Sequence, residues 1–164
     1  MIGPERSAST CAPAIRAARV EDAAPIARLA GELGYPTDAA AMRARLGLLA
    51  GQPGHWVGVA QTSTHELCGW IHVARCLVLE VGEYAEILGL VVGSQGRRGG
   101  VGRGLVAAAE RWSGEQGLTS IRVRSNVARH ESHLFYPSVG YLRSKTQHVY
   151  AKPLALAGPP ALEA

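Results

Sequence analysis

The sequence lacks the features that would assign it to several special classes. No apolar run approaches the roughly 18 residues that cross a bilayer, and the opening stretch MIGPERSASTCAPA contains no apolar core of a secretory signal. The three cysteines, Cys11, Cys68 and Cys76, form no CxxC pair and no even set, so neither a disulfide framework nor a zinc site is expected. We therefore expect a cytoplasmic protein with no membrane partner and no bound metal.

Charge is sparse and slightly basic. Charged residues make up 18% of the 164 residues and apolar residues 47%, which is typical of a folded domain. The net charge of +4 favours an anionic ligand. Nucleic acid is not expected as a partner, because the arginines alternate with glycine rather than with aromatic residues. We expect one domain over residues 13–152, between tails at 1–12 and 153–164.

The order of hydrophobic patterns predicts an α/β (α+β) domain. A short strand around 15–17 precedes two amphipathic helices, the second of them capped by Thr37. HWVGVAQ and LCGWIHVA then indicate an antiparallel hairpin, and AEILGLVV indicates a buried central strand. TSIRVRSN predicts a further strand, with Asn126 capping the helix VARHESHLFY. A last strand pair at 141–142 and 147–152 completes the order.

Residues 95–104, QGRRGGVGRG, join that central strand to a helix that begins LVAAAERW. The apolar stripe of this helix is Val101, Leu105, Ala108, Ala109 and Trp112, and Gly117 is expected to end the helix in a left-handed conformation. Glycine allows successive N–H groups to point toward a common centre, and the start of a helix adds donors and a positive dipole end. Arg97, Arg98 and Arg103 would neutralise a phosphate or pyrophosphate held there. The region contains no lysine, which excludes a Walker loop. A Rossmann-like NADP site remains a weaker alternative, because its glycines should follow the strand directly.

The segment LVVGSQGRRGGVGRGLV resembles the acetyl-CoA-binding motif of the GNAT superfamily of N-acetyltransferases. The family signature Arg/Gln-x-x-Gly-x-Gly/Ala is matched by Arg97, Gly100 and Gly102. IRAARVEDAAPIARL is similar to the family's first strand and helix, and Asn126 with the following FYPSVGY is similar to a later family segment. The resemblance implies the GNAT fold: a mixed, mostly antiparallel sheet of six to seven strands with about four helices, whose fourth and fifth strands splay apart.

The resemblance also implies a reaction, in which a primary amine attacks acetyl-CoA directly and forms a tetrahedral intermediate. Glu86 matches the catalytic base of the histone acetyltransferase branch, and Tyr136 matches a tyrosine that protonates the departing thiolate. The Val92 N–H, at a bulge of the fourth strand, would hold the oxyanion. The residues implied to bind coenzyme A are Leu90, Val91, Val92, Arg97, Arg98, Gly99, Gly100, Val101, Gly102, Arg103 and Asn126.

Each role has a structural alternative, since Glu86 could form a salt bridge and Tyr136 could serve only packing. Tyr35 and Glu86 are the residues expected on the substrate side, and His72 and His148 are weaker candidates for the base. A small-molecule amine is the favoured acceptor. The final RSKTQHVYAKPL is similar to the last strands of small bacterial members that are often homodimers. A non-catalytic acyl-CoA-binding module, acting as sensor or scaffold, is the main alternative function.

Overall fold

The structure is a computed structural model that describes residues 13–154; Cys11 and the predicted tail at 1–12 lie outside the described residues, as does most of the tail at 153–164. The chain divides into two compact units, with the boundary after Asn126. Each unit is described by itself.

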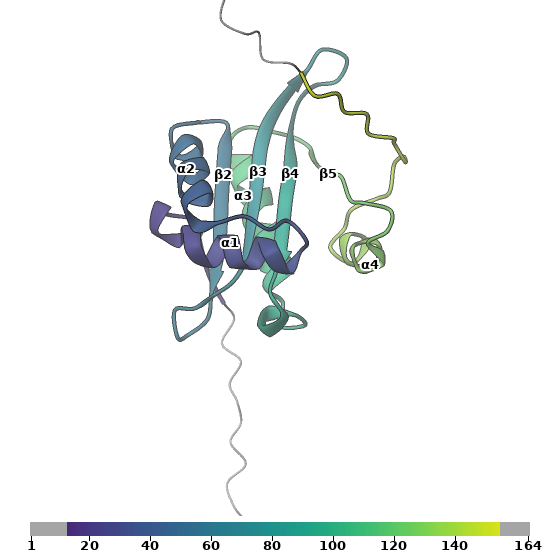
Figure 1. The fold of residues 1–164 in the computed structure, drawn as a ribbon. Coiled ribbons are helices and arrows are strands. Elements are labelled where there is room, and N and C mark those ends of the chain that lie inside the picture. The colour runs from purple at the N-terminus through teal and green to yellow at the C-terminus, as the bar shows by residue number, and fades with distance from the viewer. Residues whose placement is uncertain (1–12, 155–164) are drawn as a thin grey trace, which may run out of the picture. The chain divides into compact units, whose positions relative to one another are not determined.

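The first unit is built on a five-stranded sheet in the order β1-β2-β3-β4-β5 (Figure 1). Neighbouring strands are antiparallel, except that β4 and β5 are parallel. This mixed, mostly antiparallel sheet confirms the predicted α+β class. The strands are β1 (Ala14–Ala17), β2 (His55–Gln61), β3 (Leu67–Val78), β4 (Gly82–Val92) and β5 (Ile121–Val123).

The hairpin of β3 and β4 extends further than the apolar runs predicted. Beyond the core the two strands continue as an exposed ribbon, in which the Arg75 guanidinium donates to both carboxylate oxygens of Glu83 at 2.7 Å. Gly82 begins β4 with a φ of 74°, a left-handed conformation that favours glycine. Cross-strand pairs and turn geometry therefore lengthen the strands where the hydrophobic pattern ends.

Two helices, α1 (Ala23–Glu32) and α2 (Ala39–Ala50), lie on one face of the sheet, and α3 (Val101–Glu115) lies on the other (Figure 1). The cap of α2 is Asp38 rather than the predicted Thr37, because the Asp38 carboxylate accepts the Ala41 N–H at 2.7 Å. Thr37 stands one residue too early for this bond, and its hydroxyl accepts from Arg45 instead.

The short η1 helix (Val20–Asp22) leads into α1 and is fixed by one carboxylate. The Asp22 carboxylate accepts hydrogen bonds from both terminal nitrogens of Arg16, at 2.7 and 2.9 Å, and from the Arg19 N–H at 2.7 Å. Hydrogen bonding from Arg16 holds the pKa of the Asp22 carboxyl below its usual range, even though burial acts in the opposite direction. The carboxylate therefore ties β1 to the start of α1.

The core fills both sides of the sheet. Ile26 and Leu29 of α1 pack with Val59 and Val91 on one side. On the other side α3 buries most of the predicted apolar stripe, but Trp112 is only half-buried and Ser113 is buried in its place. The Ser113 hydroxyl is accommodated because it donates to the Ala109 carbonyl at 2.7 Å. Gly117 then has a φ of 74°, which confirms the predicted left-handed stop.

The second unit contains α4 (His130–Ser138), which begins later than predicted. Its N-cap is Arg129, so Asn126 is not the cap; a turn at Val127 and Ala128 separates Asn126 from the first helical residue. Pro137 lies in the last turn of α4, where its missing N–H costs one helical bond.

The predicted final strand pair at 141–142 and 147–152 is absent from the described residues, which contain five strands rather than six to seven. Leu142, Val149 and Tyr150 are each more than nine-tenths exposed. A strand needs a neighbour to take up its backbone hydrogen bonds and cover one face, and residues 142–154 pair with no strand of the described chain.

A core substitution tests this packing. Leu105 of α3 is fully buried, so Leu105→Ala should lower the free energy of unfolding by about 2–5 kcal/mol through lost burial and a residual cavity. Leu79 is 99% exposed, and Leu79→Ala is the matched control, expected within about 0.5 kcal/mol of wild type. Urea titration of both variants makes the comparison, and equal losses would contradict the packing of α3.

Candidate functional site

The end of β5 opens a gap beside β4. The two strands pair only at Ala85–Ile87 with Ile121–Val123, whereas β4 continues to Val92. Beyond Ile87 the backbone of β4 has no β5 residue opposite it. The fourth and fifth strands therefore part as the predicted fold requires, and the gap ends next to the segment that leads into α3.

The backbone N–H groups along this open edge can be assigned from the β3–β4 ladder. The Gly93 N–H donates to the Cys68 carbonyl at 2.9 Å. Antiparallel ladders alternate between bonded and non-bonded pairs, so Val91 and Gly89 also bond toward β3. The N–H groups of Leu90 and Val92 consequently point toward the gap. The Val91 N–H, by contrast, is used in the ladder with β3.

The bulge expected at Val92 lies four residues earlier. Gly89 stands opposite His72 and Ile87 stands opposite Val73, so Leu88 is the extra residue. Leu88 is half exposed, at the position where β4 leaves β5. The bulge thus coincides with the start of the gap rather than with its far end.

The glycine and arginine segment forms the turn between β4 and α3. After the short η2 helix (Ser94–Gly96), Arg98 and Gly100 have φ of 64° and 76°, and Gly100 is the N-cap of α3. The Gly104 N–H closes the first helical turn on the Gly100 carbonyl at 2.9 Å. The N–H groups of Val101 and Gly102 precede that ladder and lie at the positive end of the helix dipole.

The predicted anion-binding residues are thus gathered at one helix start. Arg97, Arg98, Gly99 and Arg103 are exposed there, whereas Val101 is buried as the first apolar contact of α3. Gly104 has a different role from the other glycines, because a Cβ there would lie 2.8 Å from Ile15 Cδ1. A side chain at position 104 would therefore have to displace the end of the Ile15 side chain on β1.

Glu86 lies at the inner end of the gap. It stands opposite Ala74 on β3 and opposite Arg122 on β5, so its side chain projects from the same face as theirs. Arg124 Nη2 donates to Glu86 Oε2 at 3.2 Å, and the Tyr84 hydroxyl donates to the same oxygen at 3.5 Å. The Glu86 side chain is 7% exposed and that of Arg124 is 72% exposed. A buried carboxylate is therefore held by a cation that faces solvent.

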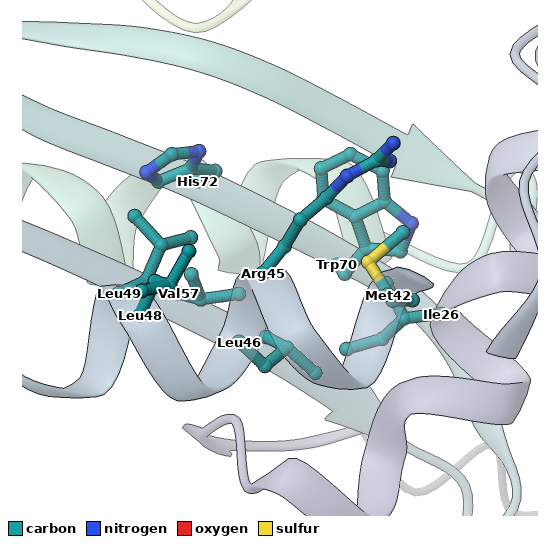
Figure 2. A pocket seen from close by; sticks show the side chains of 9 residues that line it. All are labelled: Ile26, Met42, Arg45, Leu46, Leu48, Leu49, Val57, Trp70 and His72. Carbon is teal, nitrogen blue, oxygen red and sulfur yellow. The ribbon is translucent and has the colours of Figure 1, made fainter. Parts of the chain in front are cut away.

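A cavity of about 380 Å³ lies on this same face, between α2 and the sheet (Figure 2). Figure 2 shows the side chains of α2 and of β2 and β3 facing one another across it. Arg45 and His72 are the polar members of a lining that is otherwise largely apolar. The lining residues are Ile26, Met42, Arg45, Leu46, Leu48, Leu49, Val57, Trp70 and His72.

His72 forms a pair with His55 from the neighbouring strand. Nδ1 of His55 and Nε2 of His72 lie 3.0 Å apart, which requires that one ring donate to the other. Burial, with a smaller contribution from His55, lowers the pKa of His72 to about 4. The ring is therefore neutral at neutral pH, and it can accept a proton only at the cost of its buried position.

The remaining predicted residues are more dispersed. Tyr35, in the loop between α1 and α2, is 64% exposed and does not line the cavity. Asn126 is exposed, three residues beyond β5. His148 lies in the exposed segment after α4 rather than on a strand.

Tyr136 belongs to the second unit, where its ring centroid lies 5.6 Å from that of Tyr141. Burial raises the pKa of Tyr136 to about 12, so the phenol keeps its proton throughout the physiological range. A phenol that holds its proton this firmly is better suited to donating a hydrogen bond than to releasing the proton. The role of Tyr136 as the acid stays a prediction.

The sequence did not single out Arg124, Arg45 or Trp70 as site residues. The alternation in TSIRVRSN indicated that Arg122 and Arg124 share a face, which was the available signal. The missing information was the register that places Arg122 opposite Glu86.

Comparison with known proteins assigns the family. The model of the acetyltransferase (GNAT) family matches residues 21–141, so the chain belongs to this family. No curated protein matches significantly.

Solved structures share the fold. A GNAT family acetyltransferase of Staphylococcus aureus is 20% identical and covers 87% of this chain and 100% of its own, with a TM-score of 0.72. The aminoglycoside 6'-N-acetyltransferase AAC(6')-IG of Acinetobacter haemolyticus is 17% identical, with 87% and 99% covered and a TM-score of 0.75. AAC(6')-Iy, solved with the bisubstrate analogue CoA-S-monomethyl-acetylneamine, is 16% identical, with 87% and 99% covered and a TM-score of 0.77.

Two further observations concern residues 13–154 alone. Within this range no group of three or more His, Cys, Asp or Glu side chains is arranged to hold a metal ion. None of the helices described there is long and apolar enough to cross a membrane.

The histidine pair generates a pH prediction. Unfolded histidine takes up a proton near pH 6.5, whereas folded His72 does so near pH 4, so the unfolded chain binds an extra proton between these values. Stability should therefore fall as the pH is lowered from about 6.5 to 4. The melting temperature of His72→Gln should fall less over this range than that of wild type. His148→Gln, at an exposed position, should behave as wild type, and an equal slope in both variants would contradict the assignment.

Proposed function

We propose that the protein is an acetyl-CoA-dependent N-acetyltransferase that acts on a primary amine of a small molecule. The observation that carries this proposal is the gap between β4 and β5, which ends beside the left-handed turn and N-terminus of α3. The bisubstrate analogue bound to the similar fold of AAC(6')-Iy supports coenzyme A as the ligand class.

The turn at residues 97–100 and the start of α3, together called the phosphate cradle, are suited to the pyrophosphate of coenzyme A. Backbone N–H groups from Arg98 to Arg103 would hold the pyrophosphate, where the φ of 76° at Gly100 turns the chain into the helix start. The arginine side chains at its rim would balance the negative charge. The Ser125 hydroxyl is buried with no hydrogen-bond partner within the described part of the chain, just beyond the end of β5. Such a hydroxyl is suited to an amide of the pantetheine arm entering the gap.

Acetyl-CoA supplies the activated thioester carbonyl when bound. The Leu90 and Val92 N–H groups are directed into the gap, so they can donate to the carbonyl oxygen as negative charge develops on it. Glu86 is positioned to take a proton from the amine, with Arg124 holding its carboxylate. Tyr136 is proposed to donate a hydrogen bond to the departing sulfur. The assignments of Glu86 and Tyr136 rest on the family resemblance together with the chemistry of each group.

Binding of acetyl-CoA is the first test. A ligand at 100 times its dissociation constant adds about 2.7 kcal/mol of stability, which raises the melting temperature of a domain this size by several degrees. Gly102→Val should abolish most of this rise, because a branched side chain would crowd the N–H groups that hold the pyrophosphate. The matched control is Gly114→Val, which lies in the same helix with open space around its Cβ position. Retained binding in Gly102→Val, or stabilisation by NADPH instead, would refute the cradle.

The base assignment has its own test. Glu86→Gln keeps the shape of the side chain but cannot accept a proton at neutral pH, so turnover measured by free-thiol release should fall about 10²–10⁴-fold. The control is Glu83→Gln on the same strand, whose carboxylate pairs with Arg75 in the exposed ribbon. Equal activity of Glu86→Gln and wild type would assign Glu86 to structure alone.

The ion pair of Glu86 and Arg124 favours one second candidate, a non-catalytic acyl-CoA-binding module. In that case the carboxylate serves only to hold Arg124. Such a protein would be stabilised by acetyl-CoA yet release no thiol with any amine. A homodimer and a cytoplasmic location remain predictions alongside either function.

A further inference from the structure

One face of the sheet joins the ion pair to the cavity. Along β3 the side chains on this face are those of Trp70, His72, Ala74 and Cys76, and Glu86 stands opposite Ala74. His72, which lines the cavity, is two residues from Ala74, a distance of about 7 Å along a strand. The Glu86 carboxylate and the cavity at His72 are therefore separated by a distance that one small molecule can span.

This face carries more positive than negative charge. At the positions of β3, β4 and β5 that share it, Glu86 is the single carboxylate, with Arg122 on β5 and Arg124 directly after it. Arg45 adds a third guanidinium at the cavity. Several positive charges on a ligand would meet arginines there rather than carboxylates.

The two arginines keep donors available for an anion. Arg124 uses one nitrogen for Glu86, and its side chain is 72% exposed, so the rest of its planar fork faces solvent. Arg122 lies over the Tyr84 ring with its central carbon 4.1 Å from the centroid. Stacking occupies the flat face of a guanidinium and leaves its N–H edge open to a carboxylate.

The ion pair of Glu86 and Arg124 is itself complementary to a zwitterion. An ammonium group fits the carboxylate of Glu86, and a neighbouring carboxylate fits the guanidinium of Arg124, because the two protein groups are 3.2 Å apart. The cavity volume of about 380 Å³ is at the small end of the range for ligand pockets, roughly 300–1,000 Å³. Its leucine, methionine and tryptophan lining suits an apolar side chain.

We propose that the acceptor is an apolar α-amino acid or a closely related amino carboxylate, with its carboxylate on Arg124, its amine at Glu86 and its side chain in the cavity. This assignment of the substrate class rests on the proposed acetyltransferase function. In the reaction the amine nitrogen forms a bond to the acetyl carbon as the carbon–sulfur bond breaks. The electron pair leaves with sulfur, and the proton lost by the amine passes to Glu86 and then, through solvent, to the thiolate.

The test compares acceptors that differ in one charge. Leucine, leucinamide and the polycation kanamycin are assayed with acetyl-CoA by free-thiol release. A charged hydrogen bond is worth about 1.5–3 kcal/mol, so kcat/KM for leucine should exceed that for leucinamide by about 10- to 150-fold when each value is expressed per free-amine form of the acceptor, because the leucinamide amine is the less basic of the two. A preference for leucinamide or for kanamycin would overturn the proposal.

Arg124→Gln should reduce the leucine-to-leucinamide ratio to near one. Any general loss of activity through Glu86 cancels in that ratio, which a purely structural role of Arg124 would leave unchanged. The control Arg43→Gln removes an exposed guanidinium from α2 outside the cavity, and it should retain the ratio. An unchanged ratio in Arg124→Gln would refute the carboxylate contact.

A binding arm separates failure of this inference from failure of the proposed function. Calorimetry measures leucine and leucinamide binding to the protein saturated with coenzyme A. If leucine binds selectively, Arg124→Gln abolishes that binding and no thiol is released, the ligand site is supported and the proposed catalytic function is refuted. Thiol release with other amines, together with no leucine binding, would refute the ligand site and keep the catalytic function.

Discussion

The short parallel contact between β4 and β5 determines where chemistry is possible. Only three residues of each strand pair, after which β4 continues alone. In a fully paired sheet every interior N–H is already used in a ladder. Here the parting directs two β4 N–H groups into a gap and places the bulged Leu88 at its start. Two residues beyond the end of β5, the Ser125 hydroxyl is buried without a partner in the described chain. The unpaired edge of β4 thus leads toward the N-terminus of α3, whose free N–H groups can bind an anion.

The second organising feature is the position of Glu86 where the pairing ends. A buried carboxylate without a partner is costly, and Arg124 provides the partner while remaining in contact with water. This arrangement permits exchange, since an incoming ammonium can replace part of the guanidinium contact without leaving the carboxylate unpaired. The same ion pair is compatible with a structural role or with a place in the acceptor site.

Much of the fold could be predicted because its signals are local. The β2–β3 hairpin, the central strand, the stop at Gly117 and the glycine-rich helix start each depend on neighbouring residues. The errors arose where neighbouring positions compete or where distant segments must meet. The N-cap of α2 is Asp38, one position after the predicted Thr37. The expected strand at 147–152 has no pairing partner in the described chain. Glu86 and Arg124 are 38 residues apart in the sequence, and their contact depends on the register of the parallel strands β4 and β5. Hydrophobic periodicity does not specify that register.

The glycines of the motif satisfy two unrelated constraints. Gly100 is favoured by its positive φ in the turn, whereas a Cβ at Gly104 would meet the end of the Ile15 side chain on β1, on the packed side of the same helix. A substitution at position 104 would therefore act first on the packing of α3 against β1, not on the turn that precedes the helix. In a family comparison, glycine at that position should vary together with the size of the residue at position 15, because a smaller residue there would leave room for alanine at position 104.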